Sequence, residues 1–491
     1  MSKKISFLDK TFWITESQDN PKHVASLQLL EKPENSADAY VHDLYLEMQN
    51  FASANSPFNC RVKAFLGYPL KLVPVQKMDM EYHVQYHRID DLHDKFALHQ
   101  YIAGLHEVWL DRDKPLWQFH FIEDGKSNTF VIYAKVHHMY GDGATLIRWF
   151  QAGYLPEPQT EGFVPVWATE RKRRQRPKPG LLKSVFGGLL MMVLVTVDLV
   201  WIFFRLLLKL LYINQHYMPI PFSGTKTLLT GQVKKGRVVS TVDLDFARIK
   251  RLSKRARASA NEILLCCFDI GVHRFLRDFG HRFDKALYTN MPINLRKPGE
   301  QVGGNKIAIV PVRLAHGKTD PYLRLRQIIE NHRIVKRAAK RSRPTAFSAY
   351  TIVIQSFALL FEWLRISDWV KPIANILISN VPGPTETRYL KDAKLLACYP
   401  ISTMTPGGGV NITLITYDGV ANVGLVCCSK HVKSLEKMSD YFVESLDMLE
   451  RCIDDPSLNI EDIGENVRRD HLSIVDDEPF HEEPEQHRLF K

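Results

Sequence analysis

The sequence lacks several of the patterns by which common classes of protein are recognised. Its seven cysteines include no C-x-x-C spacing and are odd in number, which argues against a zinc site and against a framework of disulfides. No G-x-S-x-G elbow of a serine hydrolase is present. Val312 stands where a phosphate-binding loop ending in Gly317-Lys318-Thr319 would need its first glycine. We therefore predict no metal site, and neither a serine hydrolase nor a P-loop enzyme.

The first residues also lack a recognisable targeting signal. They include Lys3, Lys4 and Asp9 but no apolar core of a signal peptide, which predicts a reducing, cytoplasmic compartment. A chain of 491 residues is long for one hydrophobic core, so we expect two domains. The net charge of +11 fits nucleic acid, a membrane surface or a phosphate-bearing substrate, and does not choose among them.

The N-terminal part, residues 1–165, mixes helical and strand-like patterns. Residues 129–136 are rich in β-branched and aromatic side chains, which predicts a strand that runs directly into His137 and His138. Helices are expected over residues 37–51, 92–105 and 144–150.

Residues 166–232 form a predicted linker of unusual composition. It begins with a basic cluster, which consists of Arg171, Lys172, Arg173, Arg174, Arg176 and Lys178. An apolar stretch over residues 181–212 follows and is long enough to span a membrane. Asp198, Arg205 and Lys209 project from one face of a helix here, so a helix lying in a membrane interface is favoured. A helix packed between domains and a true membrane span are the alternatives.

Residues 233–460 form the predicted C-terminal part. Strands are expected over residues 237–244, 307–314, 376–379, 410–417 and 423–428. Helices are expected over residues 246–258, 261–275, 322–341 and 435–451. The charged residues 461–491 contain few apolar side chains and are expected to form a mobile tail.

The central pattern is H-H-x-x-x-D-G at residues 137–143, directly after the predicted strand. Acyl transfer to an alcohol needs a base that takes the hydroxyl proton and returns a proton to the leaving group, and histidine titrates near neutral pH. Neighbouring residues on a strand point to opposite faces, so one of His137 and His138 should face a substrate and the other should pack inside. Two structural histidines would be the simpler interpretation without the Asp-Gly pair.

The rest of the motif is expected to shape the turn after the strand. Gly141 and Gly143 are expected to supply backbone freedom. Asp142 either orients a histidine ring or anchors the turn, and the anchoring role is favoured. We count His137, His138 and Asp142 as the candidate catalytic residues.

The motif resembles the active-site motif of the CoA-dependent acyltransferase superfamily, which includes chloramphenicol acetyltransferase, carnitine acyltransferases and peptide-synthetase condensation domains. Three further blocks resemble those of bacterial wax ester synthase/diacylglycerol acyltransferases. They are D-R-D-K-P-L-W at residues 111–117, N-E-I-L at residues 261–264 and S-N-V-P-G-P at residues 379–384. The resemblance runs from about residue 7 to residue 451.

This resemblance implies an α/β (α+β) fold with two chloramphenicol-acetyltransferase-like lobes, a helical linker between them and a channel at their boundary. It implies a fatty acyl-CoA donor, used as a substrate without any cofactor, and diacylglycerol or a long-chain fatty alcohol as acceptor. The family's base maps to His138. No nucleic acid partner is implied. Because both lobes share one site, attachment to the surface of a membrane or lipid droplet is favoured over a true span.

The other blocks have candidate roles as well. Pro115, Leu116 and Trp117 are expected to form a packed turn beneath the site rather than a substrate contact. Asn261, Ser379 and Asn380 are candidates for substrate binding or for stabilising the oxyanion. A condensation-type enzyme and a catalytically silent lipid-binding module are the alternative functions.

Overall fold

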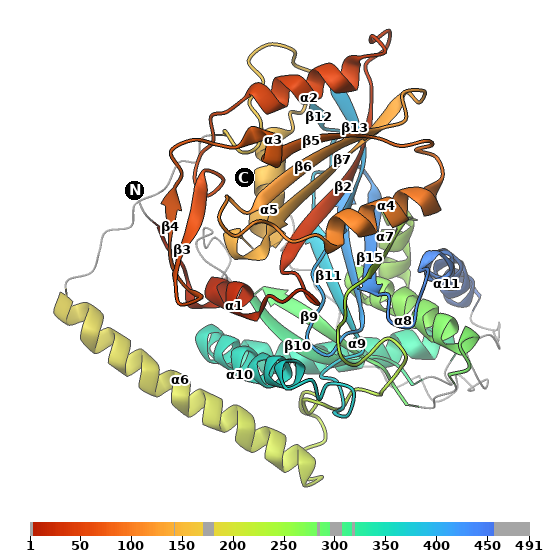
Figure 1. Cartoon of the computed structure of the whole chain (residues 1–491). Coiled ribbons are helices and arrows are strands. Elements are labelled where there is room, and N and C mark those ends of the chain that lie inside the picture. Colours follow the sequence, from red (N-terminus) through yellow and green to blue (C-terminus); the bar gives the residue numbers. More distant parts are fainter. Residues whose placement is uncertain are drawn as a thin grey trace.

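The computed structural model describes residues 3–141, 143–169, 181–281, 285–294, 307–316 and 320–455 (Figure 1). Four features named above lie outside these residues: Asp142, the basic cluster, the Gly317-Lys318-Thr319 segment and the predicted tail over residues 461–491. The described chain contains two six-stranded sheets with helices packed against them, which confirms the predicted α/β fold with two lobes.

The first lobe has the strand order β12-β13-β2-β7-β6-β5. Its strands are β2 (His23–Glu31), β5 (Val84–Arg88), β6 (Trp117–Glu123), β7 (Thr129–His137), β12 (Tyr389–Leu390) and β13 (Ala393–Ile401). Its helices are α1 (Phe7–Thr15), α2 (Tyr40–Asn50), α3 (Met80–His83), α4 (Lys95–Glu107) and α5 (Gly143–Gly153), with the 3₁₀ turn η1 (His138–Tyr140). A small sheet beside α1 consists of β1 (Lys3–Lys4), β4 (Tyr68–Pro74) and β3 (Cys60–Phe65). β7 is buried on both faces, which explains its apolar and aromatic sequence.

The second lobe has the strand order β10-β9-β11-β14-β15-β8. Its strands are β8 (Arg237–Asp245), β9 (Tyr288–Asn294), β10 (Ile307–Arg313), β11 (Ile376–Pro382), β14 (Val410–Tyr417) and β15 (Val420–Cys428). Its helices are α7 (Phe246–Arg255), α8 (Ala260–Asp278), α9 (Pro321–Arg341), α10 (Pro344–Trp363) and α11 (Glu436–Asp454). α8 is buried along nearly its whole length and forms the centre of this lobe's core.

The two sheets do not divide the chain at a single boundary. β12 and β13 lie within the predicted C-terminal part, yet β13 completes the first sheet by pairing with β2. β13 also runs so close to β15 that a Cβ at Gly424 would overlap the Pro400 carbonyl, so only glycine fits there. Tyr399 of β13 donates a 2.8 Å hydrogen bond to Asp243 of β8. A strand from the predicted C-terminal part therefore belongs to the first sheet and packs closely against the second.

Local patterns predicted most of the elements correctly. The strand expected over residues 410–417 is β14, and the helix expected over residues 322–341 is α9. The helix α10 is absent from the predictions, because apolar residues occur on all of its sides and no single apolar stripe marks it.

The apolar stretch of the linker folds into the long helix α6 (Leu181–Leu210), which runs along the edge of the second lobe (Figure 1). By length and composition alone, α6 and α10 could each cross a membrane. Ile202 and Leu206 pack against α10 and hold the two helices side by side.

The charged face of α6 is turned toward protein, not toward water. Arg343 forms an ion pair with Asp198 at 2.7 Å, and Lys209 donates to the carbonyl of Gln215 at 3.1 Å. Arg205 lies over the rings of Trp201 and Tyr217. The prediction that Asp198, Arg205 and Lys209 share one face is thus confirmed, and that face is turned toward the protein. Buried apolar contacts to α10 dictate this orientation. That the helix lies in a membrane interface stays a prediction.

The start of α8 explains the glutamate found in the N-E-I-L block. Ser259 caps the helix, and Glu262 accepts a 2.7 Å hydrogen bond from the Ser259 backbone to complete a capping box. The other Glu262 oxygen lies 2.8 Å from His332 Nδ1 of α9. Burial raises the pKa of Glu262, but its contacts with His332 and Ser259 outweigh burial and lower it overall. Glu262 therefore fixes the first turn of α8.

We predict that Glu262→Ala lowers the free energy of unfolding by about 2 kcal/mol or more. The substitution removes one half of the capping box, worth about 1 kcal/mol, and leaves buried His332 without this partner, which costs a further ~1 kcal/mol at least. Urea unfolding followed by circular dichroism measures the change. Glu444→Ala is the matched control, because Glu444 is half-exposed on α11 and its pair with Arg274 should contribute less than ~1 kcal/mol. Equal effects of the two substitutions would contradict this role for Glu262.

Candidate active site

The two histidines of the motif lie in different environments. His137 is the last residue of β7 and is fully buried, whereas His138 begins the turn η1 and is only partly buried. The strand ends between them, so the difference between them comes from the change of backbone conformation as well as from strand alternation. Of the two residues, only His138 is partly exposed.

His137 is held on three sides. Its Nδ1 accepts a 3.1 Å hydrogen bond from the Met139 backbone, and its Nε2 lies 3.4 Å from a carboxylate oxygen of Glu16. Its own backbone N–H donates to the Leu116 carbonyl at 3.0 Å. His137 is therefore held within the fold and has no access to solvent.

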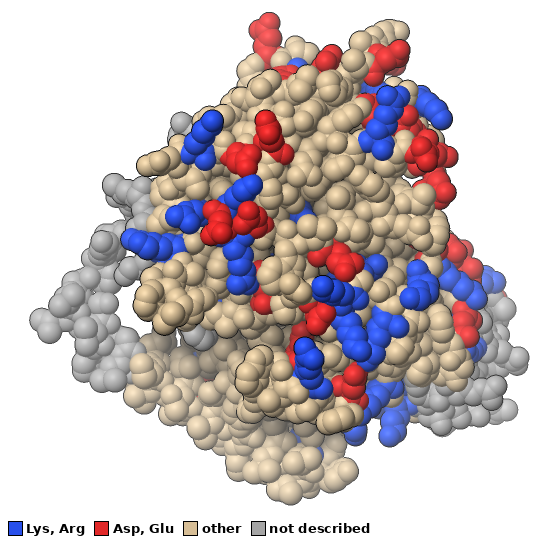
Figure 2. Space-filling view, viewed as in Figure 1, with Lys and Arg blue, Asp and Glu red and all other residues tan. Residues whose placement is uncertain are grey.

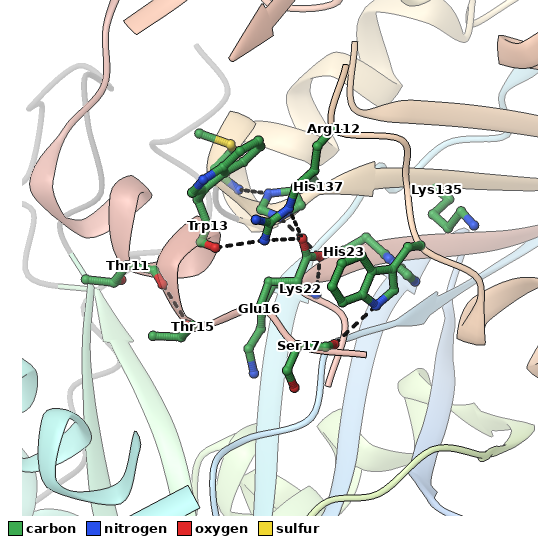
Figure 3. Close-up of polar contacts among 12 residues, drawn as sticks. Thr11, Trp13, Thr15, Glu16, Ser17, Lys22, His23, Arg112, Lys135 and His137 are labelled. Atoms are coloured by element: carbon green, nitrogen blue, oxygen red, sulfur yellow. Dashed lines mark hydrogen bonds and ion pairs between the residues drawn. The ribbon is translucent and has the colours of Figure 1, made fainter. Parts of the chain in front are cut away.

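Glu16 is the residue around which these contacts are organised, and Figure 3 shows Arg112, His137 and Lys22 gathered about it. Arg112 donates to one carboxylate oxygen through Nε at 3.2 Å and Nη2 at 3.0 Å. The Lys22 backbone N–H donates to the other oxygen at 3.0 Å. Burial alone would raise the pKa of Glu16, but these donors and His137 lower it to about 2. Glu16 is thus a buried carboxylate that remains ionised.

Sequence reasoning did not identify Glu16. Its partner Arg112 lies 96 residues away, and no local pattern marks the glutamate itself. The only available signal was Arg112, which belongs to the D-R-D-K-P-L-W block.

His138 is placed by contacts from α1 and from the start of β2. Its ring stacks on that of Phe12, with centroids 4.1 Å apart and planes 10° apart. Its backbone N–H donates to the Lys22 carbonyl at 2.9 Å. Asp142, the third candidate catalytic residue, lies outside the described residues.

Gly141 is required for space rather than for backbone freedom. Its φ of −177° is extended backbone that any residue adopts, which corrects the expectation from sequence. A Cβ at this position would lie only 2.7 Å from Cγ2 of Thr145 on α5. The turn is therefore packed too tightly against α5 to accept a side chain.

The P-L-W block is a packed turn directly beneath the motif. Leu116 and Trp117 are fully buried. The Leu116 backbone N–H donates to the Tyr140 hydroxyl at 2.9 Å, and Trp117 Nε1 donates to the Phe58 carbonyl at 2.8 Å. Pro115 begins the turn and is buried as well. The block supports η1 from below.

The S-N-V-P-G-P block reaches the motif from the second lobe. A Cβ at Gly143 would lie 3.5 Å from Val381 Cγ2 on β11, which is van der Waals contact. Side chains alternate along a strand, so Ser379 shares the face of Val381 and Asn380 points the other way. Asn380 Nδ2 donates to Asn261 Oδ1 at 2.6 Å and so ties β11 to the first turn of α8. The structure therefore pairs Asn261 with Asn380 and places Ser379 on the face that meets the motif.

Other buried titratable groups near the motif are poor candidates for a base. His23 Nε2 lies 2.6 Å from the His106 carbonyl, and His106 Nδ1 lies 2.7 Å from the Tyr133 hydroxyl. Burial lowers the pKa of His106 to about 3, and that of His23 well below its ordinary value. Lys135, whose pKa burial lowers to about 7, donates to two backbone carbonyls. The side chains of His23, His106 and Lys135 are therefore already held by hydrogen bonds within the protein.

Two further features bear on what the site can hold. No group of three His, Cys, Asp or Glu side chains within the part of the chain that the structure describes is placed to bind a metal ion. A crevice of about 280 Å³ opens between α4 and the second lobe, and its lining includes Gln100, Arg237 and Lys433. None of its lining residues belongs to the motif or to the S-N-V-P-G-P block.

Two family models match the chain. One is described as the wax ester synthase/diacylglycerol acyltransferase catalytic domain and matches residues 5–264. The other is described as the WS/DGAT C-terminal domain and matches residues 303–450. Among curated relatives, the O-acyltransferase WSD of Acinetobacter baylyi is 26% identical over 453 residues, covering 91% of this chain and 96% of that protein.

Solved structures share the same fold. The wax ester synthase/diacylglycerol acyltransferase from Marinobacter aquaeolei VT8 superposes with a TM-score of 0.72 at 22% identity, covering 92% of this chain and all of that one. A starter condensation domain of rhizomide synthetase, solved in complex with C8-CoA, superposes with a TM-score of 0.54 at 12% identity. That comparison covers 93% of this chain and 95% of that one.

We predict that Glu16→Gln destabilises the protein in a pH-dependent manner. Because the folded pKa of about 2 lies below the ordinary value of 4.5, the carboxylate contributes stability above about pH 4.5 and loses it as the pH falls toward 2. The unfolding free energies of wild type and Glu16→Gln should differ by about 3 kcal/mol near neutral pH and converge in acid.

Urea unfolding at about pH 7 and about pH 3 measures this difference. Glu157→Gln is the control, because Glu157 is exposed and its substitution should leave the unfolding free energy unchanged at both pH values. If the unfolding free energies of wild type and Glu16→Gln differ by the same amount at both pH values, lost packing rather than the charge of Glu16 explains the effect.

Proposed function

Because the chain belongs to the wax ester synthase/diacylglycerol acyltransferase family, we propose that it is an acyl-CoA-dependent O-acyltransferase. The donor is a fatty acyl-CoA, and the acceptor is diacylglycerol, a long-chain fatty alcohol or both. The observation that carries the proposal is the position of His138, which is partly exposed on a packed turn close to the second lobe. Family membership separates the chain from condensation domains, with which it shares the fold alone.

We propose that His138 is the general base. It takes the proton of the acceptor hydroxyl as the oxygen attacks the thioester carbonyl. The tetrahedral intermediate then collapses, the C–S bond breaks, and the CoA thiolate leaves as the thiol with the proton from His138. Stacking on Phe12 restricts rotation of the imidazole ring and so keeps its nitrogens aimed at the reacting oxygen.

Ser379 is our candidate for stabilising the oxyanion of that intermediate. It is half-buried on the face of β11 that meets Gly143, and its hydroxyl can donate a hydrogen bond to developing negative charge. Asn261 and Asn380 are better suited to holding β11 and α8 in register, because their side chains bond to each other.

Exchange of a thioester for an ester needs neither an oxidant nor a reductant. We therefore propose that acyl-CoA acts only as a substrate and that no cofactor takes part. The positive net charge of the chain suits the phosphates of CoA, and no nucleic acid is required.

We propose that the enzyme is cytoplasmic and acts at the surface of a membrane or lipid inclusion without crossing it. Its acceptors are lipids, and it carries one long apolar helix, α6, whose charged side chains are tied to the protein. A span through α6 would separate Gly143 from Val381, two residues that lie close together in the described chain.

We predict that His138→Ala lowers kcat by about 10²- to 10⁴-fold and leaves the unfolding midpoint unchanged. The loss is expected because His138 is the proposed base, and among the described residues His23, His106 and Lys135 are held by hydrogen bonds within the fold. Release of CoA from palmitoyl-CoA in the presence of hexadecanol measures turnover. His93→Ala is the control, because His93 is exposed and lies outside the motif, and this variant should retain full activity. Near-normal turnover by folded His138→Ala would refute the proposed base.

We predict that Ser379→Ala lowers kcat by about 10²-fold with little change in KM for acyl-CoA, because an oxyanion donor acts mainly in the transition state. Ser379→Thr keeps the hydroxyl and should retain most of the activity. The same assay separates kcat from KM. A rise in KM with unchanged kcat would instead assign Ser379 to ground-state binding.

A further inference from the structure

The described part of α6 presents an unusually apolar surface to solvent. Six of its apolar side chains that are between 49% and 66% exposed are Met192, Val197, Val200, Trp201, Leu207 and Leu210. A contiguous exposed apolar surface of this kind marks an interaction site rather than a solvated helix. In Figure 2 the lower left of the molecule, where α6 lies in Figure 1, is almost free of coloured charged residues.

The amphipathic pattern of α6 is inverted relative to a helix on the surface of a soluble protein. Asp198, the only acidic residue of the helix, is paired with Arg343 beside α10. Lys209 donates to backbone carbonyls of the loop that follows. The polar groups thus anchor the helix to the body of the protein and leave its apolar side unpaired.

α10 and the loop after it extend the same surface. Phe203 of α6 contacts Tyr350 of α10 with ring centroids 5.8 Å apart. Toward and beyond the end of α10, Trp363 is 78% exposed and Trp369 is 80% exposed. Tryptophan is enriched where an apolar phase meets water, because its ring is apolar and its indole N–H is polar.

Basic side chains gather at one end of this surface. Residues 333–343 contain six basic residues and no acidic one, whereas Glu362 and Asp368 lie near the other end. Lys336, Arg337, Lys340 and Arg341 are all exposed near the end of α9, which leads directly into α10. The basic cluster also precedes α6 in the sequence. Positive charge next to an apolar face complements a phospholipid surface that carries negative charge.

We propose that α6, α10 and the two tryptophans form one lipid-docking face that binds an anionic phospholipid surface. This inference rests on the proposed function, because a lipid acceptor would be delivered from the surface on which the enzyme sits. The apolar side of α6 enters the boundary between headgroups and acyl chains, and the basic end of α9 contacts the headgroups. The ion pair of Asp198 and the contacts of Lys209 keep the helix parallel to the surface.

Flotation of the full-length protein with vesicles tests the proposal. The vesicles are phosphatidylcholine alone, or phosphatidylcholine mixed in equal parts with phosphatidylglycerol. The wild type should float with the mixed vesicles, more weakly with the neutral ones and less at high salt. Val200→Glu with Leu207→Glu, and separately Trp363→Ser with Trp369→Ser, should each lower binding by about tenfold or more.

Val443→Glu is the matched control, because Val443 is an exposed helical valine on α11 in the second lobe, and it should bind as the wild type does. Wild-type binding by the Val200→Glu, Leu207→Glu variant would overturn the proposal. The proposal would also be overturned if the wild type does not bind vesicles and is a dimer, while the Val200→Glu, Leu207→Glu variant is a monomer. That result would mean that a second copy of the chain covers the face. Resistance of the bound protein to carbonate extraction would also overturn the proposal, in favour of a span.

Turnover of a short-chain acyl-CoA with a water-soluble alcohol distinguishes this inference from the proposed function. The docking variants should retain that turnover, because their substitutions lie outside the catalytic machinery. If the wild type floats but shows no turnover, the proposed function fails and the docking face stands. If turnover is normal but the wild type does not float, the docking face fails alone.

Discussion

The carboxylate of Glu16 lies where segments far apart in the sequence meet. It follows α1, accepts hydrogen bonds from Arg112 and from the start of β2, and faces the ring of His137. A buried carboxylate is costly unless charged or amide donors surround it, and here they come from three separate segments. The last residue of β7 is therefore fixed by a network that forms only when the N-terminal lobe is assembled.

His138 gains its position from that network. The chain turns into η1 directly after His137, so the ring of His138 is carried out of the sheet and against Phe12 of α1. Val381 of the second lobe lies against Gly143 on the other side of the motif. If His138 is the base as proposed, a hydroxyl and a thioester brought to it would meet groups from both lobes.

The sequence was most informative where a local pattern determines the structure. The strand before the motif, the helix α9 and the unequal burial of His137 and His138 were all expected from periodicity or alternation, and the structure contains them. It was least informative where distant segments meet. Glu16 has no local signature, and the addition of β13 to the first sheet depends on pairing with β2 across the whole chain.

One local expectation was wrong for a reason of packing, and another was incomplete. Gly141 was expected to supply an unusual backbone angle, but its φ is ordinary and the neighbouring Thr145 leaves no room for a side chain. Asp198, Arg205 and Lys209 were expected to share one face of a helix, and contacts with Arg343 and α10 turn that face toward the protein. Periodicity shows that residues share a face, and only the neighbouring elements decide where that face points.

The most direct measurement is a competition between acceptors. Purified protein receives palmitoyl-CoA together with hexadecanol and dioleoylglycerol at equal concentration, and both CoA release and lipid products are quantified. We expect one ester bond for each CoA released, as wax ester, triacylglycerol or a mixture of the two. Release of CoA with free fatty acid alone, or acylation of neither acceptor, would contradict acyl transfer to a lipid hydroxyl as the function of this protein.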